Sequence, residues 1–288
     1  MICTLCPRKC GVDRSVTTGF CSMPEGLRVA RAALHRWEEP VLSGSRGSGA
    51  IFFSGCSLGC SYCQNRSISA GGFGKDISTE RLRQIMEELI TQGAHNIDLI
   101  TAGHFLPWIL PALTPRLPVP VVYNCGGYES VDTLRMLEDK VDIYLPDLKY
   151  ADTGLAEALS HAPDYFTVAT AAIEEMYRQV GDYVLDAEGI LQRGVIIRHL
   201  VLPGQPGNTR RCLDWIAGTF RPGQVLVSLM AQYTPQGGMT GAMARHVTGG
   251  EYRAAVAYME NCGITDGFTQ ERTSAREEYT PPFDLSGV

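Results

Sequence analysis

Residues 55–65 read G-C-S-L-G-C-S-Y-C-Q-N and follow an apolar run, Ala50–Ser54. The stretch spaces Cys56, Cys60 and Cys63 as C-x3-C-x2-C. Three thiols this close in sequence cannot point at one centre from a regular helix or strand, so the spacing predicts a loop, and two glycines within it supply conformational freedom. Three thiolates on one loop are typical of an iron–sulfur cluster with one open iron, which can bind a small molecule.

Two other interpretations compete with a cluster. A structural zinc site uses cysteine ligands too, but it requires four ligands, and no fourth candidate stands close to the loop in sequence. The three cysteines could also be buried, inert thiols, because free cysteine is among the most buried residue types. The spacing alone therefore favours a cluster without excluding these two alternatives.

The loop resembles the C-x3-C-x-aromatic-C signature of the radical S-adenosylmethionine (SAM) enzymes, with Tyr62 as the aromatic residue. In that family, SAM binds to the open iron of a [4Fe-4S] cluster, and the reduced cluster cleaves it to a 5′-deoxyadenosyl radical that abstracts hydrogen from a substrate. The resemblance implies that Cys56, Cys60 and Cys63 form the catalytic centre. It also implies that Tyr62 shields the cluster and that Asn65, after Gln64, lies beside the cofactor.

The composition is that of an ordinary globular protein. The chain has 288 residues, of which 44% are hydrophobic and 19% charged, so it suits one large α/β domain with a small appendage. No apolar run approaches the roughly 20 residues of a membrane span. The start, Met1–Thr4, lacks the features of a secretory signal, and the clustered cysteines fit a reducing cytoplasm. The net charge of −6 argues against a nucleic-acid partner.

Residues 1–26 form a cysteine-rich module, distinct from the domain that we expect over residues 27–288. Its cysteines read C-x2-C-P-x2-C-x10-C, interleaved with prolines and glycines. So short a stretch can hardly fold on apolar burial alone, and a bound metal would supply the missing free energy. The four thiols could hold zinc or a second iron–sulfur cluster, and both remain open. The ligands would be Cys3, Cys6, Cys10 and Cys21.

The rest of the chain alternates predicted strands and helices. The expected strands cover residues 27–35, 51–55, 97–101, 119–123, 141–145, 194–202, 224–230 and 264–268. The expected helices cover residues 77–92, 105–113, 131–138, 165–180, 208–219 and 250–262. Repeated βα units give a parallel sheet that curls or closes into a barrel, but five to seven strands fall short of a full TIM barrel. The resemblance implies an α/β partial TIM barrel, (β/α)6.

Polar residues follow several of these strands, at the end where ligands bind in such folds. Thr101 and His104 follow the strand at 97–101, although the acidic residue that many relatives carry there is missing. Asn124, Asp147 and Lys149 follow the next two strands and resemble the N-G and D-x-K segments of the activating enzymes. The resemblance implies that these five residues contact SAM.

Arg198 and His199 interrupt an apolar strand. Because side chains alternate along a strand, at most one of the two should line the barrel. A charged residue inside such a strand costs free energy unless it is paired. An inward-facing Arg198 could therefore bind a carboxylate. The resemblance implies that this carboxylate belongs to SAM. Gln232–Pro235, after the following strand, is the last candidate for the substrate end of the pocket.

Segments over nearly the whole chain resemble one subfamily, the homologues of pyruvate formate-lyase activating enzyme. These segments read E-E-P, G-S-G, C-S-Y-C-Q-N, L-P-D-L-K-Y, R-H-L-V-L-P-G and M-A-Q-Y. The resemblance implies a flavodoxin or ferredoxin-type electron donor, and a glycyl radical enzyme as one candidate substrate. Two alternatives remain: a radical SAM enzyme that acts on a small metabolite or peptide, and a non-catalytic metal-binding or electron-transfer protein.

Overall fold

The chain folds around a curved sheet of parallel strands. The computed structural model describes residues 2–270 and 281–288. The parallel strands lie side by side in chain order: β2 (Ser48–Phe53), β4 (Ile97–Ile100), β5 (Val121–Cys125), β6 (Ile143–Pro146), β8 (Leu191–Leu200), β9 (Leu226–Met230) and the short β10 (Gly267–Thr269). This order, with helical crossovers, confirms the predicted partial barrel.

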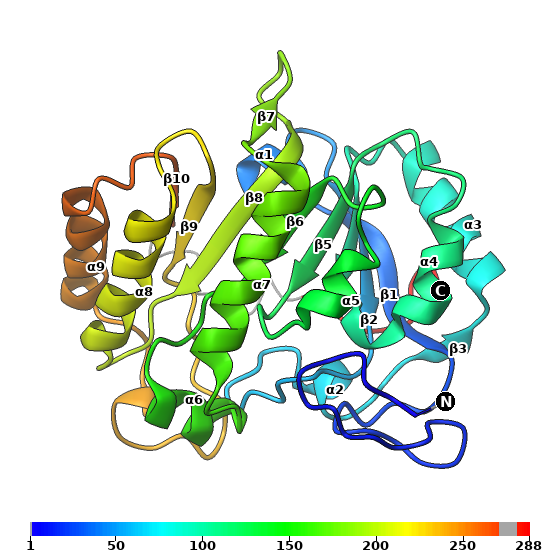
Figure 1. Cartoon of the computed structure of the whole chain (residues 1–288), viewed down its shortest axis with the longest axis horizontal. Helices are drawn as coiled ribbons and strands as arrows, with labels where there is room; N and C mark the ends of the chain where they lie inside the picture. The colour runs from blue at the N-terminus through cyan, green and yellow to red at the C-terminus, as the bar shows by residue number, and fades with distance from the viewer. Residues whose placement is uncertain (1, 271–280) are drawn as a thin grey trace.

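Helices connect these strands and cover the outside of the sheet (Figure 1). The longer helices are α3 (Thr79–Thr91), α4 (Leu106–Ala112), α5 (Val131–Arg135), α6 (Thr153–Ser160), α7 (Tyr165–Val180), α8 (Pro206–Thr219) and α9 (Gly249–Asn261). Short helical turns are α1 (Pro40–Ser43), α2 (Arg66–Ser69), η1 (Gly103–Phe105) and η2 (Gly241–Ala244). Within the described part of the chain, no helix has both the length and the apolar character needed to cross a membrane.

The first predicted strand has a different role from the others. β1 (Leu27–His35) runs antiparallel to β2, and β3 (Lys75–Ile77) extends the sheet antiparallel to β1. The link between β1 and β2 holds only the short turn α1 and folds straight back, so the two strands run antiparallel. His35, at the end of β1, therefore pairs with Ser48 at the start of β2. A two-residue strand, β7 (Val184–Leu185), pairs with β8.

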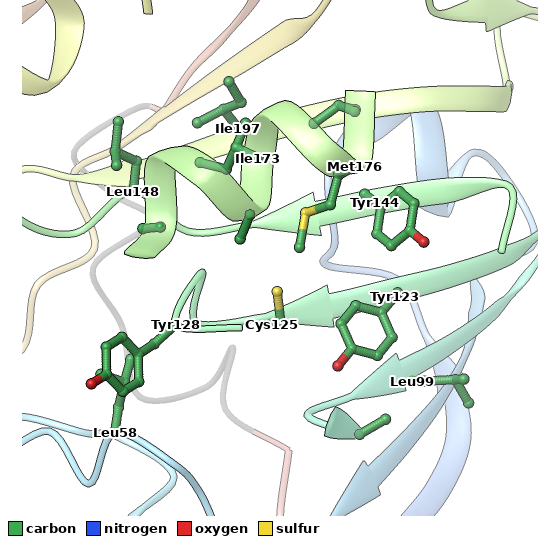
Figure 2. Packing of buried hydrophobic residues seen from close by; sticks show 14 of the residues in the cluster. Leu58, Leu99, Tyr123, Cys125, Tyr128, Tyr144, Leu148, Ile173, Met176 and Ile197 are labelled. Atoms are coloured by element: carbon green, nitrogen blue, oxygen red, sulfur yellow. The ribbon is translucent and has the colours of Figure 1, made fainter. Parts of the chain in front are cut away.

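The core lies between the strands and the helices that cover them. In α7, the residues spaced for one helix face, including Ile173 and Met176, are fully buried. Figure 2 shows these two side chains between the helix and the strands, near Tyr144. Cys125, the last residue of β5, is also buried there and is a small apolar filler.

The cysteine-rich N-terminus lies at the carboxyl ends of the strands. Figure 1 shows it as dark blue loops beneath the strand arrowheads, beside α2. Apart from a single bridge between Ile2 and Asp13, the described part of the module has no strand or helix. Thr133 of α5 donates a hydrogen bond to the carbonyl of Leu5 at 2.6 Å, which fixes the module to the barrel. The module thus packs on the face where β2 delivers the three-cysteine loop.

Candidate active site

The three-cysteine loop begins where β2 ends, and two glycines shape it. Gly55 and Gly59 have φ values of +83° and +62°, a region that favours glycine. A Cβ on Gly55 would lie 2.4 Å from Met23 Cγ and 2.7 Å from the carbonyl oxygen of Cys21. Glycine is therefore required both for the turn and for the close approach of the N-terminal module.

Hydrogen-bond donors surround the three sulfurs. Ser160 of α6 donates to Cys60 Sγ at 3.0 Å, and Ser69 of α2 donates to Cys63 Sγ at 3.3 Å. The backbone N–H of Leu58 points at Cys56 Sγ, 3.4 Å away. All three thiols are free, and Cys60 and Cys63 line the main cavity. Donors aimed at sulfur stabilise thiolate ligands, so this environment fits a metal cluster.

The pKa of the Cys56 thiol also favours a bound cationic centre at the loop. Burial, followed by repulsion from the Cys60 and Cys63 sulfurs, raises the pKa of the Cys56 thiol to about 12. Three neighbouring thiolates therefore need a cationic centre to stabilise them. No three His, Cys, Asp or Glu side chains in residues 2–270 and 281–288 are gathered as a single metal ion requires. A cluster does not need such convergence, because each of its irons binds a separate thiolate.

A cavity of about 600 Å³ runs inside the barrel from this loop toward the opposite end of the strands. Cys60 and Cys63 line it at the carboxyl end of the sheet. His35, Glu38 and Glu39 line it at the other end, because β1 returns the chain to the start of β2. The volume lies within the range of small-molecule sites.

Arg198 organises the middle of the cavity. It donates from Nε to Asp147 Oδ1 at 2.8 Å and from Nη2 to Asn124 Oδ1 at 2.7 Å, and Nη1 lies 3.4 Å from Glu38 Oε2. Lys149 pairs with the other oxygen of Asp147. Burial opposes ionisation of Asp147, but Arg198 and Lys149 outweigh it and hold the pKa of this carboxyl below its usual value.

A chain of hydroxyl groups links the signature aromatic residue to the loop. Tyr62 is buried, and the Tyr150 hydroxyl donates to its hydroxyl at 2.8 Å. The same Tyr150 hydroxyl lies 2.7 Å from Ser160 Oγ, which in turn contacts Cys60. The Tyr62 ring packs against Tyr233, with 5.8 Å between ring centroids. Tyr62 is therefore a fixed, desolvated part of the cavity wall beside Cys60 and Cys63.

Most of the predicted site residues come together in the cavity. Its wall includes the following predicted residues: Cys60, Tyr62, Cys63, Asn65, Asn124, Asp147, Lys149, Arg198 and the segment Gln232–Thr234. His199 is buried on the other side of β8, where its ring contacts the Leu148 carbonyl and Thr209. Strand alternation thus holds, with Arg198 facing the cavity.

Thr101 and His104 are not part of the cavity wall. His104 is buried, and its Nε2 lies 2.7 Å from the carbonyl oxygen of Ser54, just before the three-cysteine loop. Burial lowers the pKa of His104 to about 4, so the ring is neutral near pH 7. Arg14 of the N-terminal module donates to the His104 carbonyl. In this arrangement, His104 supports the loop from behind.

Three acidic residues at the deep end of the cavity were not predicted as site residues. Glu38 and Glu39 line it, and Asp98 of β4 lies behind Asn124, which donates to it at 3.4 Å. Burial raises the pKa of Glu39 to about 7 and raises that of Asp98 well above its usual value. The signal was present in the sequence, because Asp98 interrupts an apolar strand as Arg198 does.

The four N-terminal cysteines lie close together. Cys3, Cys6 and Cys21 are buried. Burial raises the pKa of Cys6 to about 12, and repulsion from Glu129, Cys21 and Cys3 adds to this rise. A Cβ on Gly19 would lie 3.0 Å from the sulfur of Cys10 and 3.7 Å from that of Cys21. The set is thus a group of neighbouring thiols, and its metal remains a prediction.

Comparisons with known proteins agree with this site. Residues 43–105, which contain the three-cysteine loop, match the family described as 4Fe-4S single cluster domain. Uncharacterized protein MJ0674 of Methanocaldococcus jannaschii is 30% identical over 244 residues, which cover 81% of this chain and 66% of that protein. The chain therefore spans about two thirds of the length of this archaeal relative.

The fold is shared with several solved radical SAM enzymes. SuiB of Streptococcus suis, bound to S-adenosylmethionine, superposes with a TM-score of 0.50 at 12% identity, covering 75% of this chain and 48% of SuiB. Methylornithine synthase, PylB, gives a TM-score of 0.52 at 16% identity, covering 88% and 66% of the two chains. HydG, the FeFe-hydrogenase maturase of Carboxydothermus hydrogenoformans, gives a TM-score of 0.52 at 16% identity, covering 80% of this chain and 56% of HydG.

Two features therefore converge: the partial barrel, and a segment that matches a 4Fe-4S single cluster domain and carries the C-x3-C-x2-C loop at the carboxyl end of β2. Together they give this chain the fold of these solved enzymes and a 4Fe-4S single cluster segment that contains the three-cysteine loop.

Proposed function

We propose that the protein is a radical SAM enzyme whose catalytic centre is the loop of Cys56, Cys60 and Cys63. The observation that carries the proposal is the position of this loop. It opens onto a cavity of about 600 Å³ inside the barrel, and Ser160 and Ser69 donate to two of its sulfurs. When bound, a [4Fe-4S] cluster and SAM supply, on reduction, a 5′-deoxyadenosyl radical that abstracts hydrogen from a substrate.

The chain's own residues would bind and orient SAM. Lys149 presents a cationic group for its carboxylate, and Arg198 holds Asp147 and Asn124 in position beside it. Asn124 and Asn65 line the same cavity and can hydrogen-bond the cofactor. Tyr62, fixed by Tyr150 and Tyr233, excludes water from the neighbourhood of the three cysteines.

Reductive cleavage of SAM tests the proposal. Protein purified without oxygen and reconstituted with iron and sulfide is reduced with dithionite, and 5′-deoxyadenosine is measured. We expect Cys60→Ala to abolish its formation, because the loop then lacks one cluster ligand. Cys212→Ala is the matched control, since Cys212 is buried in α8 outside the cavity and should leave the yield unchanged. Undiminished 5′-deoxyadenosine from Cys60→Ala would overturn the proposal.

The substrate distinguishes an activating enzyme, which acts on a glycyl radical enzyme, from other radical SAM enzymes. Incubation with a candidate inactive glycyl radical enzyme, SAM and a reduced flavodoxin or ferredoxin tests activation directly. A glycyl radical signal by electron paramagnetic resonance supports activation. Cleavage of SAM without that signal favours a small substrate. The second outcome fits the cavity inside the barrel, which continues beyond Asn124 to Glu38 and Glu39.

A further inference from the structure

A chain of three hydroxyl groups ends on the sulfur of Cys60. Ser160 Oγ donates to Cys60 Sγ at 3.0 Å, and Tyr150 Oη lies 2.7 Å from Ser160 Oγ. Tyr62 Oη lies 2.8 Å from Tyr150 Oη and forms the other end of the chain. Tyr150 and Ser160 are fully buried, and Tyr62 is buried too. Water does not reach the middle of the chain, so its contacts must be satisfied by its own protons.

Counting these protons fixes the direction of the chain. Each hydroxyl group has one proton, and its position rotates to suit its partners. A cysteine that binds iron is a thiolate and only accepts, so Ser160 must give its proton to Cys60. The Ser160 oxygen then needs the proton of Tyr150, and the Tyr150 oxygen needs that of Tyr62. When Cys60 is a ligand, all three contacts are satisfied only if the Tyr150 proton turns from Tyr62 to Ser160.

The framework around Tyr150 holds the middle of the chain in place. Asn208 of α8 donates to the carbonyl of Lys149 at 2.9 Å and accepts from the N–H of Ala151 at 2.8 Å. It therefore fixes the backbone on both sides of Tyr150. The Tyr150 ring packs edge to face on Tyr165, with 5.1 Å between ring centroids. The Tyr150 hydroxyl is thus kept within reach of both of its neighbours in the chain.

Ser160 has a second acceptor within its own helix. It is the last residue of α6, and a serine hydroxyl in a helix can donate to the carbonyl one turn earlier. A proton received from Tyr150 polarises the Ser160 hydroxyl and leaves its own proton for Cys60. The backbone keeps this end of α6 beside the loop, because the N–H of Ser61 donates to the carbonyl of Leu159 at 2.8 Å. The contact with Tyr150 therefore favours donation to Cys60 over donation within α6.

From this geometry we propose that Tyr150 and Tyr62 are positioning residues that direct the Ser160 hydroxyl to Cys60 and so raise the reduction potential of the cluster. A donor on a ligand sulfur stabilises the additional negative charge of the reduced form. The cysteine signature requires only an aromatic ring at Tyr62, so a role for its hydroxyl goes beyond that pattern. The assignment rests on the proposed function, because it concerns the cluster of that same site.

Reduction potentials test the assignment without any turnover. The parent, Tyr150→Phe and Tyr62→Phe are purified without oxygen and reconstituted with iron and sulfide. Each is titrated with reductant in the absence of SAM, and the reduced cluster is measured by electron paramagnetic resonance. We expect both substitutions to lower the midpoint potential, and Tyr150→Phe to lower it more, because Tyr150 contacts Ser160 directly. A midpoint potential of Tyr150→Phe equal to that of the parent overturns the proposal.

A double variant shows whether Tyr150 acts through Ser160. We expect Ser160→Ala to lower the midpoint potential at least as far as Tyr150→Phe does. In the Ser160→Ala background, Tyr150→Phe should add no further shift, because the hydroxyl that it positions is gone. An equal shift from Tyr150→Phe with and without the Ser160 hydroxyl contradicts the assignment, since the tyrosine would then act on the cluster by itself.

Tyr144→Phe is the matched control. Tyr144 is a fully buried tyrosine of β6 whose hydroxyl donates to Gln179 Oε1 at 2.6 Å, and it does not line the cavity. We expect its midpoint potential to equal that of the parent, and a shift as large as that of Tyr150→Phe overturns the assignment. The proposed function is tested separately, by 5′-deoxyadenosine formation in the parent. Equal potentials in a parent that cleaves SAM and in its Tyr150→Phe variant would therefore refute this inference alone.

Discussion

Arg8 Nε donates a hydrogen bond to the carbonyl oxygen of Ser57 at 2.8 Å, so the N-terminal module holds the three-cysteine loop by its backbone. The same guanidinium donates to the carbonyls of Leu58, at 3.4 Å, and of Ser160, at 2.8 Å, and to that of His161. One side chain thus joins the module, the loop and the end of α6. The planar fork of arginine suits such a multiple contact.

Arg8→Ala should loosen the three-cysteine loop. Hydrogen bonds from a charged donor contribute about 1.5 to 3 kcal/mol each, and the loop would lose its hydrogen bonds from Arg8. We expect the variant to release iron to a chelator several-fold faster than the parent, measured by absorbance of the iron complex. Arg36→Ala is the control, because Arg36 makes one exposed contact, to Ser45. Equal rates for Arg8→Ala and the parent would show that the module does not hold the loop.

Ser160→Ala should lower the reduction potential of the cluster. The Ser160 hydroxyl donates to Cys60 Sγ at 3.0 Å, and hydrogen bonds to ligand sulfur favour the reduced cluster. A hydrogen bond of about 1 kcal/mol corresponds to about 40 mV for one electron. Redox titration monitored by electron paramagnetic resonance measures the shift. The control is Ser67→Ala, an exposed position in α2. A potential that stays equal to that of the parent contradicts the role of Ser160.

Asp147→Asn should be strongly destabilising, because it leaves the buried cations of Lys149 and Arg198 without their shared carboxylate. Breaking a buried ion pair costs about 3 to 5 kcal/mol. We expect Lys149→Met to recover part of this loss in the double variant. Urea unfolding of the parent, the two single variants and the double variant would measure the recovery.

The exposed pair of Arg28 and Asp76 provides the control for this cycle. Asp76→Asn should cost less than about 1 kcal/mol, because solvent screens a surface ion pair. If the effects of Asp147→Asn and Lys149→Met on the free energy of unfolding instead add within about 0.5 kcal/mol, the two residues are not coupled and the description of the network is wrong.

Glu129→Gln should flatten the pH dependence of stability on the alkaline side. Burial raises the pKa of Glu129 from 4.5 to about 7, so its contribution is complete below pH 4.5 and is lost as pH rises through 7. The parent should lose about 2 kcal/mol more than the variant between about pH 5 and pH 8 in urea unfolding. Glu175→Gln is the control, since Arg178 lowers the pKa of that buried carboxyl. If the free energy of unfolding changed equally with pH in the parent and in Glu129→Gln, the predicted role of Glu129 would be wrong.

Local sequence patterns predict the parts of the structure that are determined by residues close together in the chain. The cysteine spacing predicts a loop, and the structure places it directly after β2, as the apolar run before it indicates. The polar residues after consecutive strands meet in one cavity because parallel strands present their carboxyl ends at one edge. α6 was not predicted: it includes Gly154, a poor helix former, and begins where Asp152 caps the N–H of Leu155.

The deep end of the site depends on contacts between distant residues. Glu39 reaches the barrel interior only because β1 pairs antiparallel with β2, which brings the chain back to the start of the parallel strands. Asp98 joins it from β4. Periodicity identifies β1 as a strand but does not set its direction or its partner, so the meeting of the two carboxyl groups is visible only in the folded chain.

The most direct test of the central claim is the electron paramagnetic resonance spectrum of the reduced protein with and without SAM. We expect protein with about four irons in the loop of Cys56, Cys60 and Cys63 to change its signal on addition of SAM, because the open iron then gains ligands. Cys212→Ala should behave as the parent. A reduced [4Fe-4S] signal that is identical with and without SAM would contradict the assignment of this loop as a SAM-binding catalytic centre.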